Sequence, residues 1–317
     1  MHSPKPSVLV AARFLPRLFG RRASEYSLHG LEGVGPDAIP PEAREARAII
    51  TIGGLKTDAA LMDALPKLGL IACYGTGYEG VDRTAARARG IVVTHAGDTN
   101  STAVAEFAFG LVIASARGMI RGDRFARAGR WRGDIIERTA ITPELAGQRL
   151  GVYGLGSIGA KVATRAAAFE MEIGYHNRSP RQDVPSAYHP TLLGLADWAD
   201  ILVVAVRADA GNFHAVNKKV LDALGPKGHL INISRGIAVD TDALCDALEA
   251  GGIAGAALDV FEREPNIPDR LKGLDNVILT PHMAAISANA QRAQRDLMFA
   301  NLDAFFSGRP VLTPVPE

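Results

Sequence analysis

The sequence is poor in the residues and patterns that mark several large classes of protein. Only two of its 317 residues are cysteines, Cys73 and Cys245, and both lie in apolar surroundings. Two such cysteines do not make the disulfide framework of a small secreted protein, and no cysteine or histidine cluster has the spacing of a zinc site. We therefore expect buried, reduced thiols, a cytoplasmic protein and no bound metal.

An excess of charge and a long apolar segment are missing as well. The 35 Lys and Arg residues balance 34 Asp and Glu residues, which leaves a formal net charge of +1. This balance argues against a nucleic acid or an anionic membrane as partner. The first apolar run, residues 8–12, is too short for a signal peptide, and no run approaches the roughly 20 apolar residues of a membrane span. We expect a soluble protein that binds a small molecule.

What the sequence does contain is a regular alternation. Short apolar runs alternate with helical patterns along the whole chain, which predicts an α/β fold with parallel sheets, and the length suits about two domains. The first predicted set of strands is Val8–Ala12, Ala48–Ile52, Leu70–Cys73 and Ile91–Val93. The second set is Arg149–Tyr153, Glu172–His176, Ile201–Val206, His229–Ile233, Gly255–Asp259 and Val277–Leu279.

Two helical patterns bound the second set. Residues 101–117, STAVAEFAFGLVIASAR, begin with Ser and Thr and continue with an apolar length that suits a buried connecting helix. A break in organisation is therefore expected near residue 100. Residues 286–306 form a long amphipathic pattern that ends before Gly308 and Pro310, and this last helix could pack back on the first domain.

A glycine signature, GLGSIG, follows the first strand of the second set and opens an alanine-rich helix. Glycine permits a tight turn there, lets the backbone approach a pyrophosphate and allows the strand and helix to pack closely, while the helix N-terminus faces the negative charge. The strand–turn–helix context predicts a dinucleotide site. The residues expected to line it are Gly154, Leu155, Gly156, Ser157, Ile158 and Gly159.

The strand that follows the glycine turn lacks the acidic residue that usually stands at its end in a dinucleotide site. The next strand ends in YHNRSP, with Asn177, Arg178 and Ser179 where an Asp or Glu would accept hydrogen bonds from the ribose of NAD. A guanidinium favours the extra phosphate of NADP, and the Asn and Ser side chains can add neutral donors. We predict a preference for NADPH over NADH; the alternative is that Arg178 is a solvated loop charge.

Three later segments, NISRG, LDVFEREP and LTPHMA, follow strands and contribute Arg235, Glu264 and His282. Reduction of a 2-keto acid needs a cation for the carboxylate, a hydride donor and an acid for the carbonyl oxygen. Arg235 suits the first task. His282 suits the last, because an imidazole titrates near neutrality and a paired Glu264 would orient it and favour its charged form. Glu264 could instead be a turn carboxylate, and Arg235 a solvated turn charge.

Over nearly its whole length the chain resembles the D-isomer-specific 2-hydroxyacid dehydrogenase family. The resemblance runs from ACYGTGYEGVD through NSTAVAEFAFGLVIA, the glycine turn, LINISRGIAVD and ALDVFEREP to TPH, and the Arg, Glu and His of the family fall on Arg235, Glu264 and His282. It implies two Rossmann-like, doubly wound domains with a cleft between them. The substrate domain would comprise residues 1–100 and 285–317, and the dinucleotide domain residues 101–284.

The resemblance also implies further roles. Asp259 would contact the nicotinamide carboxamide, although it could instead cap the next segment. The backbone amides of Thr76 and Gly77 would bind the substrate carboxylate together with Arg235. Members are usually homodimers, with the region of residues 101–131 at the interface. Trp131 would either line the substrate pocket or serve packing alone, and Arg207 would either touch the adenosine phosphate or face solvent.

Within the family, the NRS ending and the lack of a C-terminal regulatory domain are similar to the NADPH-dependent glyoxylate/hydroxypyruvate reductase branch. A phosphoglycerate dehydrogenase would normally carry an acidic residue after the second strand, and a formate dehydrogenase would have Gln in place of Glu264. The alternatives kept open are another 2-hydroxyacid dehydrogenase that uses NAD and a dinucleotide-sensing corepressor. The remaining histidines are expected to be structural: His2, His29, His95, His176, His189, His214 and His229.

Overall fold

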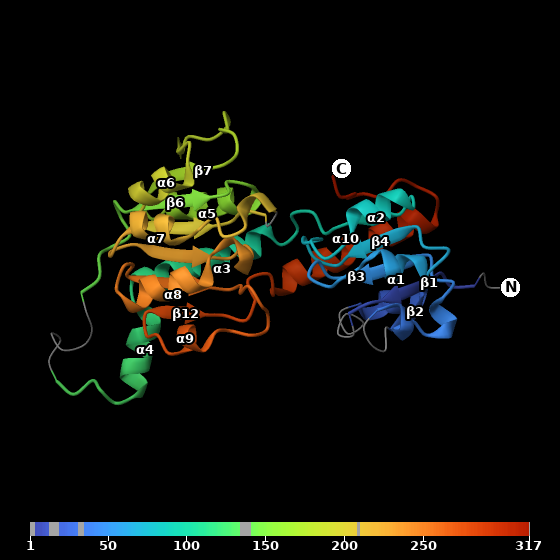
Figure 1. Cartoon of the computed structure of the whole chain (residues 1–317), viewed down its shortest axis with the longest axis horizontal. Coiled ribbons are helices and arrows are strands. Elements are labelled where there is room, and N and C mark those ends of the chain that lie inside the picture. Colours follow the sequence, from blue (N-terminus) through green and yellow to red (C-terminus); the bar gives the residue numbers. More distant parts are fainter. Residues whose placement is uncertain (1–3, 13–18, 31–34, 134–140, 208–209, 317) are drawn as a thin grey trace. The chain divides into compact units, whose positions relative to one another are not determined.

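The computed structural model describes residues 4–12, 19–30, 35–133, 141–207 and 210–316. The chain divides into two compact units. Unit 1 comprises residues 1–100 and 287–317, and unit 2 comprises residues 101–286. Each unit is built around its own parallel sheet (Figure 1), so each can be understood from the strands and helices it contains.

Unit 1 has a five-stranded sheet in the order β2-β1-β3-β4-β5, and every pairing is parallel. This is a doubly wound order, in which the chain reverses direction across β1 and β3. Its strands are β1 (Ser7–Val10), β2 (Ser27–Gly30), β3 (Ala48–Thr51), β4 (Leu70–Cys73) and β5 (Val92–Thr94). Its helices are α1 (Ala59–Asp63), α2 (Arg83–Ala88) and α10 (Ala288–Phe306).

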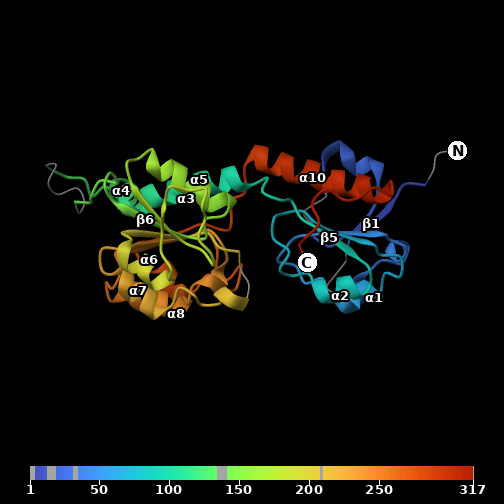
Figure 2. The ribbon, with the colours of Figure 1, turned by 90° about the horizontal axis from the view of Figure 1, so that it is seen from above.

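Helices cover both faces of the unit 1 sheet, α1 and α2 on one side and α10 on the other (Figure 2). Successive strand residues point to opposite faces. Leu9 of β1 accordingly packs in the cluster of α1 and α2, whereas Val8 and Val10 pack with Met298 and Phe299 of α10. The last helix of the chain thus belongs to the core formed by the first hundred residues.

Unit 2 has a seven-stranded parallel sheet in the order β12-β11-β10-β9-β6-β7-β8, the classic dinucleotide-binding order with one strand added. Its strands are β6 (Arg149–Tyr153), β7 (Glu172–His176), β8 (Ala187–Tyr188), β9 (Ile201–Val204), β10 (His229–Asn232), β11 (Gly255–Leu258) and β12 (Val277–Leu279). Its helices are α3 (Ser101–Ala116), α4 (Met119–Arg127), α5 (Ser157–Ala167), α6 (Leu192–Trp198), α7 (Lys218–Leu224), α8 (Thr241–Glu249) and α9 (Asp269–Lys272).

The long helix α3 packs with α5 on one face of this sheet, and α6, α7 and α8 cover the other face (Figure 2). Val104, Ala108 and Val112 of α3 lie in the core. Within the described ranges, no single helix is long and apolar enough to cross a membrane; α3 and α4 meet that test only as a pair, bent by 64°.

All ten expected strands are present, with ends that shift by up to two residues. The expected helix at residues 101–117 is α3, and the one at 286–306 is α10. Two edge strands were not expected. Three of the four residues of β2 are partly buried and the fourth is exposed, and β8 has only two residues, so neither shows an apolar run. Cys73 and Cys245 are buried and free, as predicted.

Candidate active site

The segments that carry Arg235, Asp259 and His282 leave the same edge of the unit 2 sheet. The strands β10, β11 and β12 are parallel neighbours, so their carboxyl ends lie together. Arg235 follows the end of β10 by three residues, Asp259 follows β11 directly, and His282 follows β12 by three residues. Open α/β sheets bind their ligands at this edge.

His282 and Glu264 form a close pair. Nδ1 of His282 lies 2.7 Å from Oε2 of Glu264, and the two side chains are 44% and 36% exposed. An ionised carboxylate can only accept, so Nδ1–H donates, and Nε2 is left for another partner. His282 has a φ of 49°, unusual for a residue other than glycine, and its N–H donates to the carbonyl of Asp259. The strand end therefore sets the imidazole beside the carboxylate.

The surroundings of Glu264 keep it charged. Partial burial by itself would raise its pKa, but this effect is outweighed by the hydrogen bond and charge of His282, the N–H of Phe261 and the charge of Arg235. The net result is a pKa of Glu264 below its ordinary value. The other carboxylate oxygen accepts from the N–H of Phe261 at 3.1 Å. An ionised Glu264 is the partner that a protonated imidazole requires.

Arg235 stands at the start of a short 3-10 helix, Gly236–Ala238, and is half-buried. One guanidinium nitrogen donates to the carbonyl of Ser234 at 2.7 Å, and the Asn232 side chain donates to the carbonyl of Arg235 at 3.1 Å. These local bonds fix the segment on the end of β10. The structure thus brings the cation to the edge that also carries the His282–Glu264 pair, within electrostatic reach of Glu264.

Asp259 is 1% exposed, and both of its oxygens already have partners. One accepts from the Thr280 hydroxyl at 2.6 Å and from the N–H of Met283 at 2.9 Å; the other accepts from the N–H of Ala284 at 2.9 Å. These bonds tie the end of β11 to the segment around His282. Asp259 therefore organises the loop that follows β12.

The glycines of the turn have different surroundings. Gly154 has a φ of 101°, and a Cβ there would lie 2.7 Å from the backbone nitrogen of Val206. A Cβ at Gly159 would lie 2.2 Å from the carbonyl oxygen of Gly154. A Cβ at Gly156 would meet nothing within 4 Å, so this glycine leaves open space beside the N-terminus of α5. The turn thus satisfies the requirements of a pyrophosphate cradle.

The segment after β7 is hydrogen-bonded to the glycine turn through both the N–H and the carbonyl of Leu155. The Asn177 side-chain oxygen accepts from the N–H of Leu155 at 2.7 Å, and Arg181 donates to its carbonyl at 2.9 Å. Arg181 also pairs with Asp183. Arg178 and Ser179 are exposed, and among the described residues Arg178 has no ion pair. Sequence reasoning missed the role of Arg181, for which the sequence pattern carries no signal.

The loop after β4 in unit 1 contains Thr76 and Gly77. A Cβ at Gly53 would lie 2.3 Å from the carbonyl carbon of Gly77, so the loops after β3 and β4 touch through their backbones. The Asn100 amide lies 3.5 Å from the Thr76 hydroxyl. The N–H groups of Thr76 and Gly77 donate to no acceptor in the described part of the chain. They remain available to an anion.

Arg207 is exposed, and the residues that follow it, 208 and 209, lie outside the described ranges. Trp131 is 60% exposed. Within the described residues, no group of three or more His, Cys, Asp or Glu side chains is placed to hold a metal ion.

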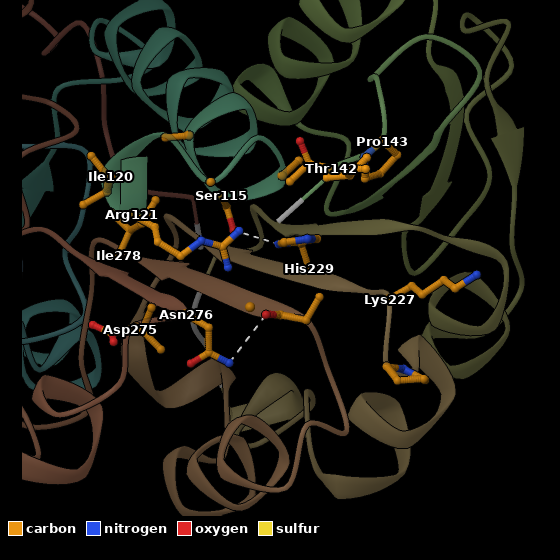
Figure 3. Close-up of a pocket in the computed structure, with 18 of the residues that line it drawn as sticks. Ser115, Ile120, Arg121, Thr142, Pro143, Lys227, His229, Asp275, Asn276 and Ile278 are labelled. Atoms are coloured by element: carbon orange, nitrogen blue, oxygen red, sulfur yellow. Dashed lines mark hydrogen bonds between the residues drawn. The ribbon is translucent and has the colours of Figure 1, made fainter. Parts of the chain in front are cut away.

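A pocket of about 470 Å³ lies at the opposite edge of the unit 2 sheet (Figure 3). Its lining includes His229, Gly255 and Val277, the first residues of β10, β11 and β12, and so marks the amino ends of the strands. The Ser115 hydroxyl and His229 Nδ1 face one another there at 2.9 Å. This pocket therefore lies at the opposite end of these strands from Arg235, Asp259 and His282.

The chain is similar to several known proteins. Residues 109–284 match the family model of the D-isomer specific 2-hydroxyacid dehydrogenase, NAD binding domain. The chain is 41% identical over 280 residues to hydroxyphenylpyruvate reductase of Plectranthus scutellarioides, covering 88% of each chain. It is 40% identical over 269 residues to glyoxylate/hydroxypyruvate reductase A of Arabidopsis thaliana, covering 85% of each.

A solved structure is similar over nearly the whole chain. The NADPH-dependent glyoxylate/hydroxypyruvate reductase from Sinorhizobium meliloti, in complex with NADP and malonate, has a TM-score of 0.91 and 42% identity, and the match covers 98% of this chain and 97% of that one. The expected doubly wound α/β fold is thus confirmed for both sheets. The chain belongs to the D-isomer specific 2-hydroxyacid dehydrogenase family.

Proposed function

We propose that the protein reduces a small 2-keto acid, glyoxylate or hydroxypyruvate, to the D-2-hydroxy acid with NADPH. The observation that carries this proposal is the 2.7 Å pair of His282 and Glu264 on the strand edge that also bears Arg235. The likeness to the Sinorhizobium meliloti reductase, which is described as NADPH-dependent, supports the choice of substrate and cofactor.

The glycine turn and the segment after β7 fit the cofactor. The open space at Gly156 and the start of α5 suit the pyrophosphate, to which the helix N-terminus presents its N–H groups. Arg178, exposed and without an ion pair among the described residues, is assigned to the 2′-phosphate, with Ser179 as a further donor. Asn177 keeps the turn in place through Leu155. When bound, NADPH would supply the hydride.

The side chains of unit 2 supply the acid and the cation. His282 donates a proton from Nε2 to the keto oxygen, where negative charge develops, while Glu264 holds Nδ1 and stabilises the imidazolium. Arg235 binds the substrate carboxylate through a charge-assisted pair. The N–H groups of Thr76 and Gly77 are assigned to the same carboxylate. In this assignment, residues 101–284 bind the dinucleotide, and residues 1–100 with 285–317 bind the substrate.

An assay of nicotinamide oxidation tests the proposal. Glyoxylate, hydroxypyruvate and hydroxyphenylpyruvate are each offered with NADPH and with NADH. The expected result is the highest kcat/KM with NADPH and one of the two small keto acids. A higher value with hydroxyphenylpyruvate would favour the second candidate, an aromatic 2-keto acid reductase like the Plectranthus relative. Dinucleotide binding without turnover of any keto acid would favour the corepressor alternative.

We also propose a cytoplasmic homodimer. Several large apolar side chains are exposed in α4 and in the residues that follow it in sequence: Met119, Ile120, Trp131 and Ile141. Ile120 and Ile141 also line the pocket of Figure 3. Large apolar side chains that gather on an exposed surface commonly mark a protein interface. Light scattering after size exclusion gives the molar mass; a monomer at micromolar concentration would contradict the dimer. The free, buried cysteines support a reducing compartment.

A further inference from the structure

A second histidine–glutamate pair lies beside the proposed catalytic pair. Nε2 of His214 is 3.2 Å from Oε2 of Glu262, and Nδ1 is 3.9 Å from a carboxylate oxygen of Asp240. The imidazole stacks on Phe213, with centroids 4.0 Å apart and 15° between the ring planes. His214 also has a φ of 48°. An imidazole fixed this closely on a loop requires a physical explanation.

His214 connects the segments that bear Arg235 and Glu264. Its backbone N–H donates to the carbonyl of Ile237 at 2.8 Å, in the 3-10 helix that starts directly after Arg235. Its side chain reaches Glu262, two residues before Glu264. One residue is thus bonded to both segments, through its main chain on one side and its side chain on the other.

The two segments also touch directly. A Cβ at Gly236 would lie 1.9 Å from the carbonyl carbon of Phe261 and 2.2 Å from the nitrogen of Glu262, so their backbones are in contact. The other oxygen of Glu262 accepts from the N–H of Thr241 at 3.0 Å, at the start of α8. Burial alone would raise the pKa of Glu262, but the hydrogen bonds from Thr241 and His214 hold it below its ordinary value. Glu262 is therefore an ionised acceptor for both.

We propose that His214 is a positioning residue, which through Glu262 sets the distance between Arg235 and the His282–Glu264 pair. This inference rests on the proposed function, because it assumes that Arg235 holds the substrate carboxylate. A shift of about an ångström between substrate-binding groups is enough to weaken binding or catalysis strongly. Loss of the His214–Glu262 bond would chiefly affect the fit of the keto acid and would leave dinucleotide binding intact.

The test compares His214→Phe, which keeps the ring stack but has no donor, with His214→Gln, which can still donate to Glu262. The expected result for His214→Phe is a rise of roughly tenfold in KM for the keto acid and an equal rise in the Kd of oxamate, an unreactive keto-acid analogue, on the NADPH complex. KM for NADPH should change less than about twofold. His214→Gln should restore both constants to near the wild-type values.

Two further variants keep the test decisive. Glu262→Gln can still accept from Thr241, but it presents a neutral NH2 group to His214 in place of the charged acceptor, so it should shift the oxamate Kd in the same direction as His214→Phe, even if the latter does not fold. Asp240→Asn keeps the helix cap and should have no such effect. Unchanged oxamate binding in both His214→Phe and Glu262→Gln, or an equal rise in the NADPH constant, would overturn the inference. A wild-type protein that neither binds oxamate nor reduces a keto acid would instead contradict the proposed function.

Discussion

The pairs His282–Glu264 and His214–Glu262 consist of the same two types of side chain. They differ in which nitrogen of the imidazole ring bonds the glutamate and which nitrogen does not. In the first, Nδ1 bonds the carboxylate and Nε2 has no partner within the described residues. In the second, Nε2 bonds the carboxylate and Nδ1 faces Asp240 at 3.9 Å. An imidazole with an open nitrogen can deliver a proton, whereas one between two carboxylates serves to connect segments.

Exposure separates the pairs in the same direction. The side chains of His282 and Glu264 are 44% and 36% exposed, against 30% and 26% for His214 and Glu262. A proton donor must be reached by its substrate, whereas a connection between segments gains from shielding. The comparison teaches that the role of a His–Glu pair depends on which ring nitrogen bonds the carboxylate and on how exposed the pair is. The predictions below test whether the two pairs differ in this way.

The largest effect is expected from His282→Ala. Loss of a general acid commonly costs 10²–10⁴-fold in turnover, so kcat for reduction should fall by roughly that factor, with little change in KM for NADPH. His214→Phe should leave kcat within about threefold at saturating keto acid. Steady-state kinetics on both variants decide the matter; an equal fall in kcat for the two would remove the distinction between the pairs.

A substitution in the proposed binding site for the 2′-phosphate should leave the function of both His–Glu pairs unchanged. Arg178→Ala removes the charge assigned to the 2′-phosphate, and charge-assisted hydrogen bonds of about 1.5–3 kcal/mol correspond to roughly a 10–100-fold rise in KM for NADPH. KM for NADH should stay unchanged, as should the Kd of oxamate. Arg44→Ala, an exposed arginine of unit 1, serves as the charge-matched control. Equal losses with NADH and NADPH would contradict the phosphate assignment.

Arg207→Ala belongs in the same assay. Arg207 is exposed after β9, and the sequence leaves open whether it touches the adenosine phosphate or solvent. A selective rise in KM for NADPH would assign it to the phosphate, and no change would assign it to solvent.

Much of this architecture could be predicted from the sequence because buried parallel strands have short, nearly continuous apolar runs in their sequence. The runs at residues 149–153 and 201–204 gave the centre of the unit 2 sheet, and hence the strand ends that bear Arg235 and His282. The edge strands β2 and β8 were not predicted because little of either strand is buried. Edge pairing depends on neighbours in space, which a local pattern does not encode.

The connections around the site could not be predicted for the same reason. His214 was expected to be an ordinary structural histidine, since nothing in its local sequence indicates Glu262, 48 residues later, as a partner. Asn177 was expected to add a neutral donor to the phosphate, and nothing in its local sequence indicates that its oxygen also accepts from the N–H of Leu155, 22 residues earlier in the chain. Residue types and strand ends show where a group can lie, but only the folded backbone shows to what it is bonded.

The two glutamates should differ in how they govern the pH dependence of reduction. The hydrogen bond and the charge of His282 lower the pKa of Glu264, so the imidazole faces an ionised carboxylate. Glu264→Gln removes that charge, so the loss of reductive activity at high pH should move to lower pH. Glu262→Gln should leave this limb in place. A pH profile of kcat with saturating NADPH measures both, and a limb that moves equally in the two variants would refute the division of roles.

The smallest expected effect concerns acid stability, where the pairs should behave alike. Both glutamates have a pKa lowered by folding, so the stability each contributes is complete above the pKa of the unfolded chain and is lost as pH falls through the folded value. Wild-type protein should therefore lose thermal stability as pH falls from neutral to about 4, and each Gln variant should lose less, by roughly 1–3 °C in Tm. Melting curves at the two pH values provide the measurement, and identical losses in wild type and both variants would mean that neither carboxylate is stabilised by its histidine.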